Sequence, residues 1–452
     1  MLIRAYLGLV LLAATPAWSQ LEFTPFQTAT APSDESQMLT PPPVSGEAYP
    51  TMVGSETRSN YLDAGLIFNA AYNDNVLPDN SATPVRDATY SVLPTLTINQ
   101  ITPRQRRTLT YTPGFTFYQH TSALNAADHN AIVDFQYRLS QHTTINFRDS
   151  FQKSSNVFNQ AYPFSGVAIS GSQQSLPPEA VAPYANRLYN TASGGISYQF
   201  GLNRMVGAGV NNVLSDYPNP TEAPGLYNSR SLGISVFYNH RLSSTQYVGL
   251  TYQYVRNHSD PVDAHANPLN TQIELHTHTL LPFYTIYFNP TLSLSLSAGS
   301  QYFDASQLHS LPVRSWAPSV MTSIGWQKSR ANFVASYSRT VTGGVGLPGV
   351  FNSNNANASV RLQIARAWVA EAIAAYSINK NVTPSFSSFS SGGHTVTGTI
   401  SFTHAISEHF QTEAGYVRLH QSYGGIAVIS AAPDSNREYI TISYHLTRPL
   451  GR

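Results

Sequence analysis

Apolar and polar side chains alternate with a period of two along most of this chain. The stretch TLSLSLSAGS (residues 291–300) shows the pattern at its simplest, because leucine and serine take alternating positions and no charge interrupts them. Successive side chains of a β-strand point to opposite faces, so the segment predicts a strand with one apolar and one neutral polar face. The same alternation recurs in 231–239, 247–256 and 395–403.

Eighteen strands are predicted from Asn60 onward, where a helical period is almost absent. The predicted strands are 60–73, 86–100, 106–120, 129–139, 142–153, 186–200, 203–216, 228–241, 244–257, 270–288, 290–303, 312–327, 329–342, 350–365, 367–379, 393–406, 409–420 and 436–448.

The connections between these strands alternate between short and long. Short turns are expected near Asn289–Pro290 and Lys328, whereas 74–85 and 154–185 are long loops. Bacterial outer-membrane barrels have an even number of strands, short periplasmic turns and longer external loops. The pattern predicts a transmembrane antiparallel β-barrel of about 18 strands with both termini in the periplasm. A soluble β-sandwich would need a two-domain split that is not visible, and no fixed repeat period supports a solenoid.

The composition agrees with a membrane barrel. Only 11% of the 452 residues are charged and 12% are aromatic, whereas roughly 25% of a typical globular chain is charged. Neutral polar side chains replace the missing charges, as expected for a lipid-facing outside and a wet inside. A net charge of +1 gives no reason to expect a nucleic-acid partner, and the absence of cysteine excludes a disulfide scaffold and a cysteine-ligated metal.

The amino terminus predicts export. Arg4 precedes a short apolar run, and Ala17-Trp18-Ser19 fits a cleavage site, so 1–19 is expected to be a signal peptide rather than an anchor helix. The Pro-, Ser- and Thr-rich segment 20–57 is expected to be a disordered periplasmic leader. The expected barrel is 58–452, and the expected location is the outer membrane of a Gram-negative envelope.

The start of the barrel carries the most distinctive local sequence. NAAYNDNVLP (69–78) and YSVLPTLTINQ (90–100) are followed by RRTLTYTPGFTFYQH (106–120) and the run 128–156. Together, residues 60–156 resemble the β-barrel porin 2 family, outer-membrane barrels associated with exopolysaccharide systems. The resemblance implies a passive or export-linked pore and brings no catalytic residues.

Ten polar side chains are candidates for the pore lining, because each alternates with residues expected to face lipid. Among them, an inward Arg148 would influence ion selectivity, although it can equally be one member of a charge ladder without such an effect. The candidates are Asn146, Arg148, Thr251, Gln253, Glu274, His276, His278, Ser293, Ser295 and Ser297.

Glu274, His276 and His278 share one strand face, and this column faces the lumen if Ile273 and Leu275 face lipid. Carboxylate and imidazole are ligands for zinc and similar ions. Neighbouring ligands are not visible in the sequence, so a polar lumen lining is the simpler interpretation. No metal or cofactor is expected.

Three functions are compatible with this sequence. The preferred one is a pore that is passive or linked to exopolysaccharide export, with polysaccharide or small polar solutes as cargo. The alternative is a plugged structural or adhesive barrel. A rim-located enzyme is disfavoured because neither G-x-S-x-G nor H-E-x-x-H occurs. Outer-membrane lipid and the assembly machinery are the other expected partners.

Overall fold

The structure is a computed structural model that describes residues 60–76, 85–156, 158, 185–262, 272–307, 310–343, 346–383, 386, 392–424 and 434–450. The predicted signal peptide and leader lie outside the described residues, as does most of the predicted loop 154–185. No helix in the described ranges is long and apolar enough to cross a membrane.

Eighteen strands are present, so the predicted number is confirmed. The first are β1 (Asn60–Asn73), β2 (Asp87–Ile101), β3 (Gln105–Tyr118), β4 (Ala126–Arg138), β5 (Thr143–Ser154), β6 (Arg187–Gln199), β7 (Arg204–Asp216), β8 (Tyr227–Ser243) and β9 (Gln246–Pro261). The others are β10 (Ile273–Asn289), β11 (Leu292–Gln307), β12 (Val313–Lys328), β13 (Ala331–Thr342), β14 (Phe351–Ala365), β15 (Trp368–Asn381), β16 (Gly393–Ala405), β17 (Phe410–Tyr423) and β18 (Asp434–Pro449). Among the described residues, the short 3-10 turns η1 (Ser122–Leu124) and η3 (Pro220–Glu222) lie in connections.

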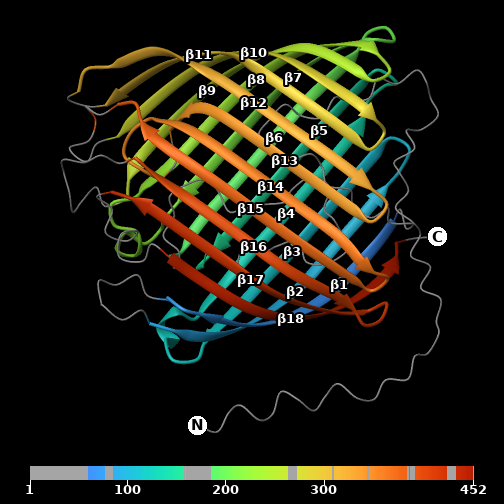
Figure 1. Ribbon diagram of the computed structural model, residues 1–452, viewed down its shortest axis with the longest axis vertical. Coiled ribbons are helices and arrows are strands. Elements are labelled where there is room, and N and C mark those ends of the chain that lie inside the picture. The colour runs from blue at the N-terminus through green and yellow to red at the C-terminus, as the bar shows by residue number, and fades with distance from the viewer. Residues whose placement is uncertain are drawn as a thin grey trace.

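The strands form one closed antiparallel barrel. Each strand pairs with its sequence neighbours, and β1 closes the ring by pairing with β18 as well as with β2. Figure 1 shows the strands inclined across the barrel wall. Closure leaves no open sheet edge, and every strand finds its backbone partners within the wall.

The two rims of the barrel differ in their connections. β1 begins where β18 ends, because Tyr61 lies opposite Pro449, so the first and last strands share a rim. The short turns, such as Asn289 to Leu292, lie at this periplasmic rim. The longer connections, including 217–226 and 343–350, lie at the opposite rim, here called the outer rim.

The outside of the barrel is apolar across its middle. Leu296 on β11 is 46% exposed, whereas the next residue along, Ser297, is 3% exposed, so the two faces of the strand have opposite environments. Leu280, Val236 and Ile400 are exposed in the same way. Such a surface is unfavourable in water by about 25 cal/mol per Å² and is suited to hydrocarbon.

Aromatic side chains flank this band on the outside. Towards the outer rim, Tyr72 and Trp316 are exposed, and towards the periplasmic rim, Trp368 and Tyr444 are exposed. An apolar band between two aromatic girdles on a closed, even-stranded barrel is the architecture of outer-membrane proteins. The chain is therefore an outer-membrane β-barrel.

Glycines opposite aromatic residues let large rings lie against the inner wall. Gly207 on β7 lies opposite Phe237 on β8, and Gly415 on β17 lies opposite Tyr439 on β18. A Cβ atom at either glycine would overlap the ring opposite it. These positions require glycine for close approach, which alternation alone does not predict.

Candidate pore lining

Four of the ten side chains predicted to line the pore lie on the inner wall and are at least partly exposed. Asn146 and Arg148 alternate with the exposed Phe147 on β5, while Thr251 and Gln253 alternate with outward-facing residues such as the exposed Tyr252 on β9. Each of the four is exposed or half-buried. This part of the inner wall combines amide, hydroxyl and guanidinium groups.

Arg148 has an acidic partner on the neighbouring strand. Asp134 on β4 lies opposite it, and the Arg148 Nε atom is 3.6 Å from the Asp134 Oδ1 atom. The two side chains are 28% and 29% exposed. Arg148 is therefore part of an inward ion pair, and its charge is partly balanced by Asp134.

The three serine candidates of β11 face inward but are covered. Ser293, Ser295 and Ser297 are 9%, 0% and 3% exposed. Ser295 Oγ lies 2.9 Å from Thr285 Oγ1 of β10, and Ser297 donates to the carbonyl oxygen of Pro282 at 3.1 Å. These hydroxyls are packed polar groups of the wall, so the wet surface predicted for this face is more restricted than the alternation indicates.

Glu274, His276 and His278 are on the other side of the wall, and their placement in the lumen was wrong. Ile273 and Leu275 are 1% and 2% exposed and belong to an inward apolar cluster. The three polar residues share the outward face of β10 with the exposed Leu280. The prediction assumed that apolar residues face lipid along the entire strand, which fails near the outer rim.

The interpretation of these three residues as zinc ligands has no geometric support. In the part of the chain that the structure describes, no group of three His, Cys, Asp or Glu side chains is placed to hold a metal. The Nδ1 atoms of His276 and His278 instead lie 2.8 Å from the hydroxyls of Tyr254 and Tyr252, respectively.

Charge is distributed unevenly around the inner wall. Within the described parts of β7–β13, the inward positions carry no charged side chain apart from Arg241, next to a periplasmic turn. The charged inward side chains lie on the remaining strands and include Asp63, Asp128, Asp134, Arg148, Arg187, Arg361, Glu371, Glu413 and Arg437. The lumen therefore has one neutral side and one side of mixed charge.

The charged side includes a hydrogen-bonded network that was not predicted. The Tyr439 hydroxyl donates to Glu413 Oε1 at 2.6 Å. Arg437 donates to Asn69 Oδ1 at 2.8 Å, and the Asn69 amide donates to Thr441 Oγ1 at 2.8 Å. Strict alternation with Ile440 and Ile442 is the signal that assigns Tyr439 and Thr441 to the inner face.

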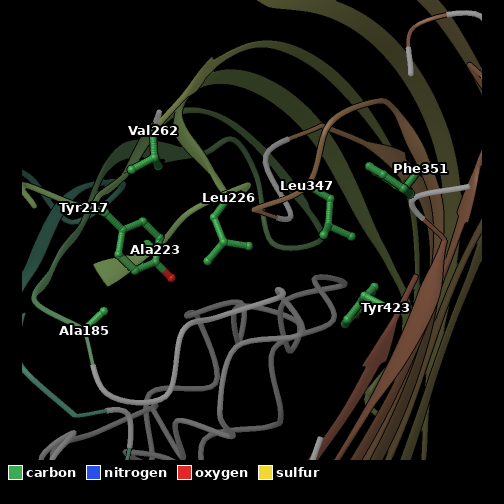
Figure 2. Packing of buried hydrophobic residues seen from close by; sticks show 8 residues of the cluster. All are labelled: Ala185, Tyr217, Ala223, Leu226, Val262, Leu347, Phe351 and Tyr423. Atoms are coloured by element: carbon green, nitrogen blue, oxygen red, sulfur yellow. The ribbon is translucent and has the colours of Figure 1, made fainter. Parts of the chain in front are cut away.

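Apolar contacts cross the outer end of the lumen. One buried cluster joins residues near β6–β9 to residues on or near β14 and β17, and these strands lie on widely separated sides of the ring (Figure 2). Its members are Ala185, Tyr217, Ala223, Leu226, Val262, Leu347, Phe351 and Tyr423.

Two backbone hydrogen bonds hold this cluster together. The Tyr227 N–H donates to the Gly346 carbonyl at 3.1 Å, and the Val262 N–H donates to the Leu226 carbonyl at 3.0 Å. Gly346 has a φ of 75°, a conformation that favours glycine. The connection 217–226 and residues 346–350 of the next long connection named above therefore fold inward and meet.

Comparison with known proteins supplies no family for this chain. The sequence matches no known protein family, and no curated protein is a recognisable relative. Among solved structures, OpdK of Pseudomonas aeruginosa with vanillate is 8% identical with a TM-score of 0.41, covering 86% of this chain and 99% of OpdK. OccK2 (OpdF) of the same organism is 7% identical with a TM-score of 0.43, covering 86% and 98%.

The FrpB iron transporter of Neisseria meningitidis is another solved structure to which this chain is similar. It is 8% identical with a TM-score of 0.40, and the match covers 81% of this chain. The match covers 63% of FrpB, so this chain spans less than two thirds of that transporter's length. Similarity at this level carries no conclusion about cargo.

Proposed function

We propose that this outer-membrane barrel is a pore for small polar solutes, with its entrance narrowed at the outer rim. The observation that carries the proposal is the partly open inner wall on β5 and β9, where Asn146, Arg148, Thr251 and Gln253 face the lumen. Water-exposed amides and hydroxyls can exchange hydrogen bonds with a passing solute at little net cost.

Uncharged carbohydrate is the preferred cargo. The partly exposed inward residues Thr251 and Gln253 of β9 offer a hydroxyl and an amide on the side of the lumen where Arg241 is the one inward charge among the described residues, and these groups match the hydrogen-bonding groups of a sugar. The resemblance of residues 60–156 to exopolysaccharide-associated barrels is a second reason for this preference. An export role rests on that resemblance and is part of the proposal.

Conductance measurements on the refolded protein in planar bilayers test the pore. We expect discrete channels whose current is reduced by neutral oligosaccharides. Gln253→Leu removes an inward amide and should weaken block, whereas Gln363→Leu, at an inward position next to the periplasmic turn, serves as the matched control. Absence of channels from correctly folded protein would overturn the proposal.

A plugged barrel is the second candidate, and the apolar cluster across the outer end favours it. Leu226 and Leu347 are fully buried in that cluster, and aspartate at either position would place a charge in an apolar site. If the cluster closes the lumen, Leu226→Asp and Leu347→Asp should increase conductance. Leu311→Asp is the control, because Leu311 is 85% exposed near the same rim. Equal conductance in all variants would argue against closure by this cluster.

A further inference from the structure

The outward face of β9–β12 changes character in steps near the outer rim, while on β8 the exposed Ile234 and Leu232 continue the apolar face as far as Arg230. Strand register places the exposed apolar residues Val236 and Leu280 in one row with Tyr252. The next row towards the rim is aromatic and contains Tyr254, His278, Tyr302 and Trp316. The row above it contains Arg256, His276, Asp304 and Arg314, and Arg230, His258 and Glu274 follow. Rows are about 7 Å apart.

We propose that this surface, here called the outer-rim patch, binds the phosphorylated sugar headgroup of a glycolipid in the outer leaflet. The patch consists of Arg230, Tyr252, Tyr254, Arg256, His258, Asp260, Glu274, His276, His278, Tyr302, Asp304, Arg314 and Trp316. The proposal concerns the outside of the barrel and is independent of what the lumen transports.

Arginine supplies the donors for phosphate. Arg256 donates to Glu274 at 2.6 Å and Arg314 donates to Asp304 at 2.9 Å, while their side chains remain 55% and 63% exposed. A guanidinium has five N–H donors in a planar fork, so one such contact leaves others for a phosphate. Arg230 is exposed and has no ion pair within the described residues.

The two histidines are oriented by tyrosine. His276 and His278 each use Nδ1 to contact a tyrosine hydroxyl, at 2.8 Å in both cases. When the hydroxyl donates to Nδ1, the ring proton resides on Nε2, and Nε2 becomes a donor. A neutral histidine held in this tautomer contributes a fixed N–H next to the arginine row.

The patch is not a simple cationic surface. Its three arginines are balanced by Asp260, Glu274 and Asp304. These carboxylates already have partners, because His258 Nε2 lies 3.1 Å from Asp260 while Glu274 and Asp304 contact arginines. Binding is therefore expected to depend on directed short-range donors rather than on net charge.

Continuity with the lipid-facing wall identifies a lipid as the source of the phosphate. Leu280 and Val236, which lie directly below the aromatic row, are 48% and 52% exposed in the apolar band. A glycolipid whose acyl chains lie on that band brings its headgroup to the level of the patch. Trp316 is 69% exposed, and its ring centroid is 5.3 Å from that of Tyr302, so two aromatic rings are available at the sugar level.

The test measures glycolipid retention by the full-length folded protein in mild detergent, using native mass spectrometry. The probes are bis-phosphorylated lipid A and the same lipid after removal of both phosphates. We expect the bis-phosphorylated probe to bind at least tenfold more tightly to the wild type. Arg230→Gln, Arg256→Gln and Arg314→Gln combined should reduce its binding at least tenfold and leave the dephosphorylated lipid unchanged.

Arg107→Gln is the matched control, because Arg107 is an exposed arginine near the periplasmic rim on the outside of β3. It should bind as the wild type does. His276→Ala combined with His278→Ala is a second variant, with an expected two- to fivefold loss, in case the triple variant does not fold. Equal binding of the two lipids, equal binding by wild type and folded variants, or full competition by inorganic phosphate at the same concentration would each overturn the proposal.

Discussion

β10 has opposite polarity in its middle and near the outer rim. In the middle, the outward Leu280 is exposed and the inward Thr279 is 4% exposed. Near the rim, the inward Leu275 is 2% exposed and packs in an apolar cluster, while the outward Glu274 is paired with Arg256. Between Glu274 and Leu280 the alternation does not slip, but the apolar face changes from outside to inside.

The length of the strand explains this inversion. β10 has 17 residues, and about 9–11 tilted residues suffice to cross a membrane. The outer part of the strand therefore extends beyond hydrocarbon, where its outside meets headgroups or water. Its inside packs against connections that fold inward, as Val350 and Phe386 do in the cluster with Leu275. The outward face is therefore polar where it meets headgroups or water, and the inward face is apolar where it packs against the connections.

The largest expected effect is on the inward side near the rim. Leu275→Ala should destabilise the barrel by about 2–5 kcal/mol, since it removes a buried side chain from a packed cluster. Reversible denaturant unfolding in lipid vesicles measures the change. The matched control is the outward Leu280→Ala, which leaves no internal cavity. Equal effects of the two substitutions would show that the inner cluster adds no packing stability.

A charge substituted on the outward face of β10 also distinguishes the middle of the strand from its end near the outer rim. Leu280→Arg places a cation in the apolar band one row below the aromatic row and should cost more than about 1 kcal/mol, because the cost of arginine rises from about 0–1 kcal/mol at the interface to about 2–4 kcal/mol at the bilayer midplane. His276→Arg, two rows nearer the outer rim, should cost about 0–1 kcal/mol, as expected at an interface. Both values come from unfolding in vesicles. Similar costs at the two positions would contradict a membrane boundary between them.

The smallest expected effect concerns the covered hydroxyls of β11. Ser295→Ala removes the partner of Thr285, and both residues are fully buried. The expected cost is about 1–3 kcal/mol, because a buried hydroxyl is left without that hydrogen bond. Ser295→Ala combined with Thr285→Val should be less destabilising than the single substitution. If Ser295→Ala is neutral in unfolding experiments, water reaches this wall and the face is open.

The sequence pattern was sufficient to predict the strands of the barrel wall, but not to predict which side chains line the lumen. The predicted first strand, 60–73, coincides with β1, and the predicted tenth strand, 270–288, overlaps β10 closely. The two-residue alternation is a local property, so it can be recognised in the sequence without knowledge of the fold. The placement of His276 failed because polarity was taken as a measure of orientation, and orientation depends on where the strand leaves the membrane.

Other features of the lining depend on contacts between distant segments. Ser295 lies on the inner face of β11, but its burial depends on what packs against it. The ion pair of Arg148 with Asp134 depends on register between β4 and β5. The contact of Tyr227 with Gly346 joins residues far apart in the chain, and no local pattern indicates that two connections meet across a lumen.

The sequence by itself determined the eighteen alternating strands, the short and long connections and the outer-membrane barrel, because these follow from local periodicity and turn-forming residues. Only the tertiary structure decided which face of each strand end is buried, which hydroxyls are covered, and where apolar connections cross the outer end. Those properties are set by the membrane boundary and by packing between segments distant in sequence. The clearest consequence of the membrane boundary and of this packing is the position of Glu274, His276 and His278. These residues face outward, opposite to the orientation inferred from the sequence pattern.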